Sequence, residues 1–377
     1  MVYLNNAATT WPKPDCVLKA LNDAAAGLPQ GQFRGTGSSI DVFAELKKEL
    51  AALFHTSDPA RFVMTSGATD SLNYLIRGLG IPADEYCITA TEHNSVLRPL
   101  YNIPGIAVDP GPVVVPCDRH GIVDPDLMEK SLRAGTKVIL LNHCSNVTGA
   151  VQNAKAVGEI ARRHGLIFLL DTSQSAGCLP VDIDGWGVDG LVFTGHKSLL
   201  GVQGTGGFYA GARLHLAPVR FGGTGRNSRQ ITYDFQDPAD IEYETGTQNG
   251  PGAAALLAGV RWILEKSVEK IAGEEHAKMT ALIDFLENLP GITVFGADAK
   301  NHGPVLSFRA DRFSPSDLSY ILQNSYGIVT RTGLHCAPLI HRFIGSDPGG
   351  TVRISVSPFT TEEDILSFEE AMREIMS

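Results

Sequence analysis

Two residues whose types could support catalysis stand directly after predicted strands. Asp171 ends the apolar segment that starts at Leu166, and Lys197 follows the segment from Gly190 to Thr194. Ligands bind at the carboxyl ends of strands in α/β sheets, so we expect both side chains in a binding site. Pyridoxal 5'-phosphate (PLP) requires such a pair: an amine that bonds to its aldehyde and a carboxylate that keeps its pyridine nitrogen protonated. The pair alone does not decide the matter, because strands often end in aspartate and loop lysines are usually solvated.

Two nearby segments could bind a phosphate group. Residues 64–70, MTSGATD, follow a predicted strand and open a predicted helix, so backbone N–H groups such as that of Ala68, with the Thr69 hydroxyl, could cradle a phosphate. Thr194 and His196 flank the lysine and supply further donors beside the same cofactor. The alternative for the first segment is an ordinary strand-to-helix turn capped by serine or threonine.

The elements that must position these residues alternate along the chain. Between residues 40 and 210, strand-like runs that end in polar turns alternate with helical patterns, which is typical of a mostly parallel sheet wrapped by helices. The predicted strands are Arg61–Met64, Tyr86–Thr89, Lys137–Asn142, Leu166–Asp171, Gly190–Thr194 and Gly207–Ala210. The predicted helices include Asp41–Phe54 with Ser38, Ser39 or Asp41 as its N-cap, Ala253–Leu264, and Glu362–Met376.

The pattern changes after residue 250, where a long helix leads into shorter mixed elements. This change indicates a second, smaller α+β domain. We predict a large domain over residues 13–261 and a small domain that combines residues 1–12 with residues 262–377. The length of 377 residues agrees with two or three domains at roughly 150 residues each.

The composition is that of an ordinary folded protein. Hydrophobic residues make up 43% and charged residues 19% of the chain, which excludes extensive disorder. The formal net charge of -10 provides no general attraction for nucleic acid or anionic lipid. The longest apolar runs, such as Val138–Leu141, are far shorter than the ~20 residues of a membrane-spanning helix.

The N-terminus and the cysteines indicate a reducing compartment. Residues 1–6 have neither a basic head nor an apolar stretch, so we expect no secretory signal and a cytoplasmic location. The six cysteines are widely spaced and form no C-x-x-C pair, which disfavours a zinc site and a disulfide framework. We expect most of them to be small buried residues.

Three separated motifs resemble the cysteine desulfurase family. They are Asp171-x-x-Gln174-Ser175-x-Gly177, then Thr194-Gly195-His196-Lys197, then Arg331-Thr332-Gly333-Leu334-His335-Cys336-Ala337. The family belongs to class V of the fold-type I PLP enzymes, and the chain is similar to its SUF-type branch. The resemblance extends from Tyr3 to the segment around Arg353. It implies an α/β fold, with a mostly parallel mixed sheet wrapped by helices and a smaller α+β C-terminal domain.

The resemblance implies roles for the residues that would hold PLP. His93 would stack on the pyridine ring and assist proton transfer, although alone it could equally be a capping or surface histidine. Asn146 and Gln174 would bond the phenolic oxygen of the cofactor or the substrate carboxylate, although asparagine in such a turn is often a backbone device. The remaining cofactor residues would be Ala68, Thr69, Asp171, Thr194, His196 and Lys197.

The resemblance also implies a substrate site and a second subunit. Arg353 and Arg331 would bind the carboxylate of L-cysteine, for which a guanidinium fork is suited; for Arg353 the alternative is a plain surface ion pair. Thr247 lies in a segment similar to the family stretch whose threonine reaches the phosphate of the neighbouring subunit. A homodimer with shared active sites follows from that similarity.

Cys336 distinguishes a desulfurase from other PLP enzymes. Only an exposed, partly ionised thiol attacks the substrate sulfur and keeps it as a persulfide. His335, Arg331 or the cofactor would help to ionise this thiol. The short loop that carries Cys336 implies a sulfur-accepting partner protein, and the alternative is a buried structural cysteine.

The predicted reaction converts L-cysteine to L-alanine. Lys197 removes the α-proton, Asp171 sustains electron withdrawal by the cofactor, and Cys336 takes the sulfur. The alternatives are a selenocysteine lyase, another class V enzyme such as a C–S lyase or aminotransferase, and a PLP-binding protein without activity. Turnover of selenocysteine but not cysteine by Cys336→Ala would favour the selenocysteine lyase. Release of pyruvate instead of alanine would favour another class V enzyme, and PLP binding without a response to amino acids would favour the inactive protein.

Overall fold

A seven-stranded sheet lies at the centre of the computed structural model, which describes residues 1–27, 41–102, 110–223, 229, 231–232, 243–296 and 302–377. The strands lie in the order β2-β8-β7-β6-β5-β3-β4. Their bounds are β2 Phe62–Thr65, β3 Tyr86–Thr89, β4 Val113–Val115, β5 Val138–Asn142, β6 Ile167–Asp171, β7 Gly190–Thr194 and β8 Gly206–Ala210. Strands β3 to β7 run parallel, and β8 is antiparallel to both β7 and β2. The predicted mixed, mostly parallel sheet is confirmed, and β4 is the strand that the sequence pattern did not reveal.

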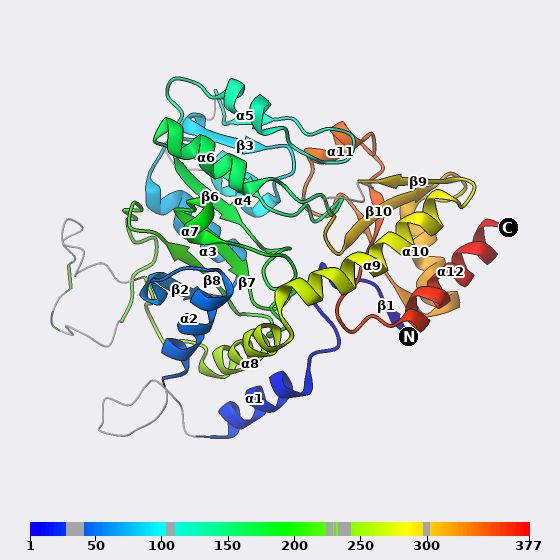
Figure 1. Cartoon of the computed structure of the whole chain (residues 1–377), viewed down its shortest axis with the longest axis horizontal. Coiled ribbons are helices and arrows are strands. Elements are labelled where there is room, and N and C mark those ends of the chain that lie inside the picture. Colours follow the sequence, from blue (N-terminus) through cyan, green and yellow to red (C-terminus); the bar gives the residue numbers. More distant parts are fainter. Residues whose placement is uncertain (28–40, 103–109, 224–228, 230, 233–242, 297–301) are drawn as a thin grey trace.

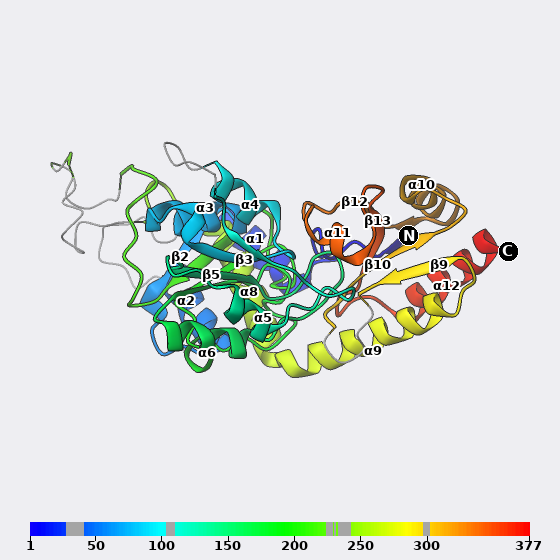
Figure 2. The ribbon, with the colours of Figure 1, turned by 90° about the horizontal axis from the view of Figure 1, so that it is seen from above.

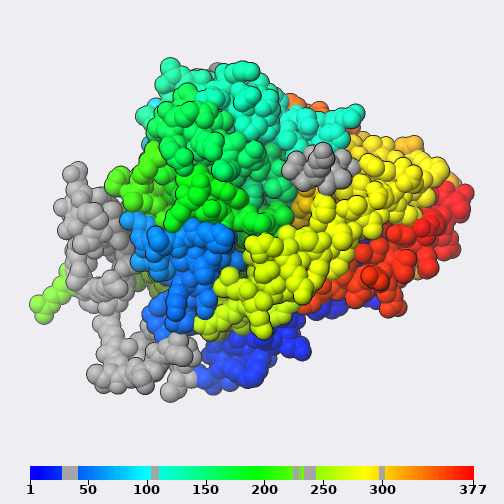
Figure 3. Space-filling model, in the orientation of Figure 1, coloured from blue at the N-terminus to red at the C-terminus, as the bar shows by residue number. Residues whose placement is uncertain are grey.

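Helices cover both faces of this sheet (Figure 1). They are α1 Asp15–Ala26, α2 Val42–Leu53, α3 Ala68–Leu79, α4 Asn94–Tyr101, α5 Pro125–Ser131, α6 Ala154–His164, α7 Ile183–Trp186 and α8 Gly250–Lys266. Asp41 caps α2 by accepting the backbone N–H groups of Phe43 and Ala44, whereas Ser38 and Ser39 lie outside the described residues. Helix α1 lies against α8, and the two are adjacent on the surface that Figure 3 shows.

The strands are apolar throughout because both of their faces are buried. Side chains alternate between the two faces of a strand. In β5, Val138 and Leu140 pack with residues of α3 and α4, whereas Ile139 and Leu141 pack with residues of α2, α6 and α8. Such burial on both sides is the reason that parallel strands form continuous apolar runs.

A second part of the chain has its own sheet and its own core (Figure 2). Strands β9 Ile292–Phe295, β10 Val305–Ala310, β12 Arg331–Gly333 and β13 Thr351–Ser355 form an antiparallel sheet in the order β12-β13-β10-β9. Strand β1 Val2–Tyr3 pairs with β11 Ile328–Val329. Helices α9 Val268–Glu287, α10 Pro315–Tyr326, α11 Ile340–Ile344 and α12 Glu362–Met376 complete this part.

The two ends of the chain meet in this second part. Leu4 shares its core with Phe308 and Phe368, so the first residues pack with the C-terminal segment rather than with the large sheet. The predicted boundary between residues 261 and 262 falls inside α8, a helix that packs against α1 and α2. The division into domains stays a prediction.

None of the helices within the described residues combines the length and apolar character needed to span a membrane.

Candidate functional site

Three adjacent strands carry polar residues at their carboxyl ends. Asn142 ends β5, Asp171 ends β6 and Thr194 ends β7. Asn142 pairs in register with Asp171, and Asp171 pairs with Val192 of β7. Because these strands are parallel, their polar ends meet at one edge of the sheet, where open α/β folds bind their ligands.

A cavity at this edge brings nine predicted residues together. We call it the lysine cavity. Its lining residues are Ala68, Thr69, His93, Ser95, Asn142, Asn146, Asp171, Ser173, Gln174, Thr194, His196 and Lys197. Nine of these twelve were candidates from the sequence, and only Ser95, Asn142 and Ser173 were not. The two predicted phosphate-binding segments and the Asp171–Lys197 pair thus face one space.

Asp171 is held as a buried acceptor. Only 3% of its surface is exposed, and its Oδ1 accepts the backbone N–H of Ser173 at 2.9 Å and the Ser173 hydroxyl. Burial raises the pKa of Asp171, while the Ser173 hydrogen bonds and the Lys197 charge oppose that rise. Within the described residues no donor contacts Oδ2, so this oxygen is available to a ligand in the cavity.

Burial shifts the protonation equilibrium of Lys197 toward the neutral amine. Burial lowers the pKa of Lys197 to about 8, although the charge of the Asp171 carboxylate partly opposes this shift. At pH 7 roughly one amine in ten is then unprotonated, compared with fewer than one in a thousand for an ordinary lysine. An unprotonated amine is the form that attacks an aldehyde or removes a proton.

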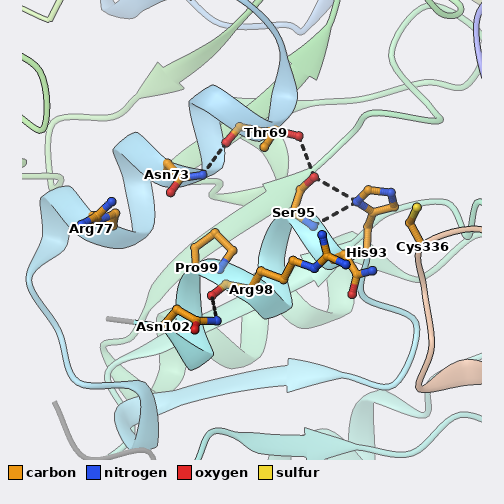
Figure 4. Close-up of a pocket in the computed structure, with 10 residues that line it drawn as sticks. Thr69, Asn73, Arg77, His93, Ser95, Arg98, Pro99, Asn102 and Cys336 are labelled. Atoms are coloured by element: carbon orange, nitrogen blue, oxygen red, sulfur yellow. Dashed lines mark hydrogen bonds between the residues drawn. The ribbon is translucent and has the colours of Figure 1, made fainter. Parts of the chain in front are cut away.

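His93 is both a helix cap and a lining residue. Its Nδ1 accepts the backbone N–H of Ser95 at 3.0 Å at the start of α4, so the neutral ring carries its proton on Nε2. Burial and the charges of Lys197 and Arg353 lower the pKa of His93 to about 4, which keeps the ring neutral at pH 7. Figure 4 shows the Ser95 hydroxyl between His93 Nδ1, 3.0 Å away, and the Thr69 hydroxyl, 2.7 Å away.

The start of α3 lies at one end of the cavity. The first N–H groups of a helix have no partner within the helix and point along its positive end. The N–H groups of Ala68 and Thr69 are the first two of α3 and lie at this end of the cavity. Gly67 precedes them, and its φ of 151° permits the sharp turn from β2 into the helix. A Cβ on Gly67 would lie 3.7 Å from the Thr194 hydroxyl, so this turn and the end of β7 enclose the same space.

Cys336 lies at the tip of a tight turn. Ala337 N–H donates to Leu334 O at 2.9 Å, and the two central residues, His335 and Cys336, have φ values of 49° and 61°. Positive φ at both central positions is the mark of a type I′ turn, and it is unusual for residues other than glycine and asparagine. Cys336 and Cys16 are the exposed cysteines, and the other four are buried as expected.

The Cys336 turn is bonded to the edge of the large sheet. The backbone N–H of Asn94 donates to Cys336 O at 2.7 Å, and the Asn146 side chain donates to His335 O at 2.6 Å. These bonds hold the turn beside His93 and Asn146. His335 itself is buried, its Nε2 lies 2.9 Å from the Thr351 hydroxyl, and burial lowers its pKa to about 2. It is therefore uncharged at pH 7, so it supplies no positive charge that would favour the Cys336 thiolate.

Cys336 opens into a cleft that shares a wall with the lysine cavity. We call it the cysteine cleft, and its lining residues are Thr69, Asn73, Arg77, His93, Asn94, Ser95, Arg98, Pro99, Asn102 and Cys336. Thr69, His93 and Ser95 line both spaces. The charge of Cys336 also acts on the pKa of Lys197, which it raises. The amine and the thiol therefore lie in adjoining spaces that share three lining residues.

Arg353 is a buried cation without an acidic partner among the described residues. Its guanidinium donates to Asn146 O at 2.9 Å and, more weakly, to Asn5 Oδ1 at 3.4 Å, while Nε has no partner. Burial and the neighbouring Arg331 charge lower the pKa of Arg353 to about 9. The structure thus excludes a plain surface ion pair for Arg353.

Arg331 pairs with Arg353 directly across the β12–β13 ladder and is exposed. Like charges in directly opposite positions repel, so an anion bound near them would stabilise both.

Thr247 is the predicted site residue that lies elsewhere. It is exposed and lines a separate cavity with Thr65, Ser66 and Asp70, on another side of the turn that begins α3. This position is compatible with a contribution to another subunit, and the single chain does not bring Thr247 to Lys197.

The sequence analysis did not identify three residues that line the lysine cavity, nor the buried Glu92 next to it. Asn142 is the last residue of its strand, as Asp171 is, and that shared position is a signal that could have identified it. Ser95 and Ser173 each stand two residues after a predicted site residue, which allows local hydrogen bonds but distinguishes them little from ordinary turn serines. Glu92 is fully buried beside His93 and bonds to the backbone of Asn142.

Comparison with known proteins gives a consistent result. Residues 2–368 match the family model described as aminotransferase class-V. A probable cysteine desulfurase of Methanothermobacter thermautotrophicus is 31% identical and aligns with 99% of this chain and 94% of its own length. The cysteine desulfurase CsdA of Escherichia coli is 27% identical, over 97% of this chain and 91% of its own.

The fold is also that of a solved desulfurase. The apo structure of a cysteine desulfurase from Thermococcus onnurineus NA1 has a TM-score of 0.85 and 27% identity, and the match covers 100% of this chain and 94% of that one. This similarity confirms the predicted fold class. The chain therefore belongs to the aminotransferase class-V family, within which its relatives include cysteine desulfurases.

Proposed function

We propose that this protein is a PLP-dependent cysteine desulfurase, which converts L-cysteine to L-alanine and holds the released sulfur on Cys336 as a persulfide. One observation carries the proposal. Lys197, an amine of lowered pKa, and Cys336, an exposed thiol on a strained turn, lie in two adjoining cavities that share lining residues. The relatives named as cysteine desulfurases support the same reaction.

The lysine cavity has the groups that PLP requires. Asn142 Oδ1, Asn146 Oδ1 and His196 Nδ1 are buried without a hydrogen-bond partner among the described residues, as is expected where a polar ligand supplies the partner. The N-terminal N–H groups of α3, with Thr69, Thr194 and His196, would hold the phosphate. Asp171 would hold the pyridine nitrogen, His93 the ring face, Lys197 the aldehyde, and Asn146 and Gln174 the phenolic oxygen.

PLP, when bound, withdraws the electrons that remain at the substrate α-carbon after its proton is lost. The residues of the chain supply the rest. Lys197 accepts the α-proton, because its pKa of about 8 lets it act as a base near neutral pH. Asp171 would keep the ring nitrogen protonated, and the neutral His93 would donate a hydrogen bond from Nε2 toward the cavity.

The arginines and the thiol complete the reaction. Arg353, whose Nε has no partner, binds the substrate carboxylate, with Arg331 beside it. The Cys336 thiolate attacks the substrate sulfur, the C–S bond breaks, and its electron pair stays with the carbon that becomes the methyl group of alanine. No external oxidant or reductant is needed, since the sulfur leaves with the oxidation level of a persulfide while the carbon is reduced.

The test compares two exposed cysteines. In PLP-loaded Cys336→Ala, we expect the absorbance of bound PLP to be retained and alanine release from L-cysteine to fall at least a hundredfold, because the sulfur acceptor is gone. Cys16→Ala removes the other exposed thiol and should behave as wild type. Alanine release by Cys336→Ala at the wild-type rate would refute the role of this thiol.

A homodimer and a sulfur-accepting partner also belong to the proposal. Thr247 is exposed, as a residue that serves a neighbouring subunit must be in a single chain. Cys336 is exposed as well, so a second thiol has access to a persulfide formed there.

A further inference from the structure

The cysteine cleft extends well beyond the lysine cavity. It has a volume of about 450 Å³, which lies in the range of sites for small molecules. Helices α3 and α4 form its walls, and Figure 4 shows Cys336 at one end and Arg77 at the opposite end. Between them lie Asn73 and Asn102, whose side chains play no part in the proposed desulfuration. A cleft of this extent beside the thiol has room for a second substrate.

The charge of the cleft contrasts with that of the chain. The protein has a formal net charge of -10, yet among the described residues no acidic side chain lines the cleft, whereas two arginines do. Arg77 and Arg98 are exposed, and neither guanidinium has an ion pair or hydrogen bond within the part of the chain that the structure describes. The Arg98 charge reaches the inner end of the cleft, because it contributes to the lowered pKa of His93.

The reaction of a persulfide defines what the second substrate must contain. An acceptor thiolate attacks the outer sulfur, and a new S–S bond forms. The bond between this sulfur and Cys336 Sγ breaks, its electron pair remains on Cys336 as a thiolate, and the acceptor leaves as a persulfide. The number of electrons is conserved, so no other reagent is required. Nearby guanidinium groups favour the thiolate of the acceptor and bind carboxylates in a planar fork.

We propose that the cysteine cleft binds an acidic thiol, an acceptor whose sulfhydryl is accompanied by carboxylates. Arg98 orients a carboxylate near Cys336, and Arg77 binds a second one farther along the cleft. The source is either a free small thiol or a cysteine within an acidic protein segment, since the two share this chemistry. The inference rests on the proposed function, because it assigns the partner of the Cys336 persulfide.

The experiment measures sulfur transfer from the PLP-loaded enzyme to thiols of different charge. The probes are mercaptosuccinate, with two carboxylates, and neutral 2-mercaptoethanol. A five-residue cysteine peptide with four acidic residues is compared with its amide counterpart. We expect kcat/KM for at least one acidic probe to exceed that for its neutral counterpart at least tenfold. Added salt should reduce the ratio, because it screens exposed charges. Preference for mercaptosuccinate identifies a free thiol as sufficient, and preference for the acidic peptide alone identifies a protein segment.

Variants connect the preference to the cleft. Arg77→Gln and Arg98→Gln should each lower kcat/KM for the preferred acidic probe at least fivefold, with a smaller effect on its neutral counterpart. Arg342→Gln removes an exposed arginine outside the cleft and should leave the preference unchanged. Equal kcat/KM values for acidic and neutral probes in wild type, or a preference that survives both cleft substitutions, would overturn the inference. Alanine formed in a single turnover without any acceptor tests the desulfurase reaction separately. Failure of the proposed function can therefore be distinguished from failure of the proposed acceptor site.

Discussion

At the scale of residues, burial controls the ionisable groups of the site. Lys197 and Arg353 have lowered pKa values, Asp171 has a raised one, and in each case burial is the largest cause. The unpaired donors and acceptors around them are costly in a folded protein unless a ligand satisfies them. The site is thus arranged for a charged, polar ligand rather than for the stability of the empty chain.

Burial also determines the ionisation of Glu92, which lies behind the lining residues of the lysine cavity. It is fully buried, its Oε1 accepts the Thr89 hydroxyl at 2.6 Å and the Asn142 N–H at 3.0 Å, and Oε2 has no partner among the described residues. Burial raises its pKa from 4.5 to about 8. Glu92 is therefore a neutral carboxyl group at pH 7.

Replacing Glu92 should change how stability depends on pH. Above pH 4.5 the unfolded chain ionises Glu92 while the folded chain keeps the proton, so this group destabilises the fold increasingly up to about pH 8. The slope is about 1.4 kcal/mol per pH unit at most. Glu92→Gln cannot ionise, so its free energy of unfolding relative to wild type should rise between pH 5 and pH 8. Urea titrations of the PLP-free protein measure it.

Glu287→Gln is the control, since Glu287 is exposed near the end of α9. Its free energy of unfolding relative to wild type should show little dependence on pH. A Glu92→Gln difference that stays constant across this range would mean that Glu92 ionises equally in the folded and unfolded chain.

At the scale of elements, close packing of backbone supports the strand end that carries Asp171. Helix α6 approaches α7 at Gly158, where a Cβ would lie 1.8 Å from the carbonyl oxygen of Trp186. The Trp186 ring packs on His143 at 5.3 Å, and His143 N–H donates to Asp171 O at 3.0 Å. Gly158 is thus connected to Asp171 through Trp186 and His143, so we expect a shift of backbone at Gly158 to affect the position of Asp171.

Two glycine substitutions separate packing from helix propensity. Gly158→Ala should lower the free energy of unfolding by about 1–3 kcal/mol, because backbone must move to admit the methyl group. Gly273→Ala, on the exposed side of α9 with nothing within 4 Å of the added Cβ, should instead raise it by about 0.5–1 kcal/mol. Thermal or urea unfolding checks both signs. A stabilised Gly158→Ala protein would show that the two helices separate easily.

At the scale of the whole molecule, the site is built where the two parts of the chain meet. The large sheet supplies Asp171 and Lys197, and the second part supplies Cys336 and Arg353. Hydrogen bonds cross between them, including that from Gln174 to Ala7 O at 3.0 Å. Relative movement of the two parts would therefore change the separation of thiol and amine.

Mixed dimers test whether the site also crosses between subunits. In the proposed homodimer, Thr247→Asp would place a negative charge at the phosphate and abolish activity, and Lys197→Ala would abolish activity by removing the amine. A mixed dimer contains one chain of each variant. If Thr247 serves the other subunit, one site then combines an intact Lys197 with an intact Thr247, and the mixed dimer should recover about half of the wild-type activity. Differently tagged chains, purified as mixed dimers, allow the measurement. An inactive mixed dimer would place Thr247 at the site of its own chain.

Local patterns were sufficient to predict six of the seven strands of the large sheet, three helices and the inner part of the site. The six predicted strands are correct within one residue, and α12 was predicted with its observed bounds, because long apolar runs and caps are local signals. Strand β4 was missed because three valines are too short a pattern. Asp171 and Lys197 were recognisable because Asp171 ends the apolar run of its strand and Lys197 stands three residues after the end of β7.

The sequence by itself therefore determined the sheet, the residue types at its edge, and the chemistry that a lysine, a carboxylate and a thiol allow. Only the tertiary structure decided which of these groups meet. The neutral state of His335, the lack of an acidic partner for Arg353 among the described residues, and the arginines of the cysteine cleft depend on burial and on contacts between distant segments. No local pattern encodes these, because desolvation and electrostatic coupling arise only when the chain encloses a group and removes it from water.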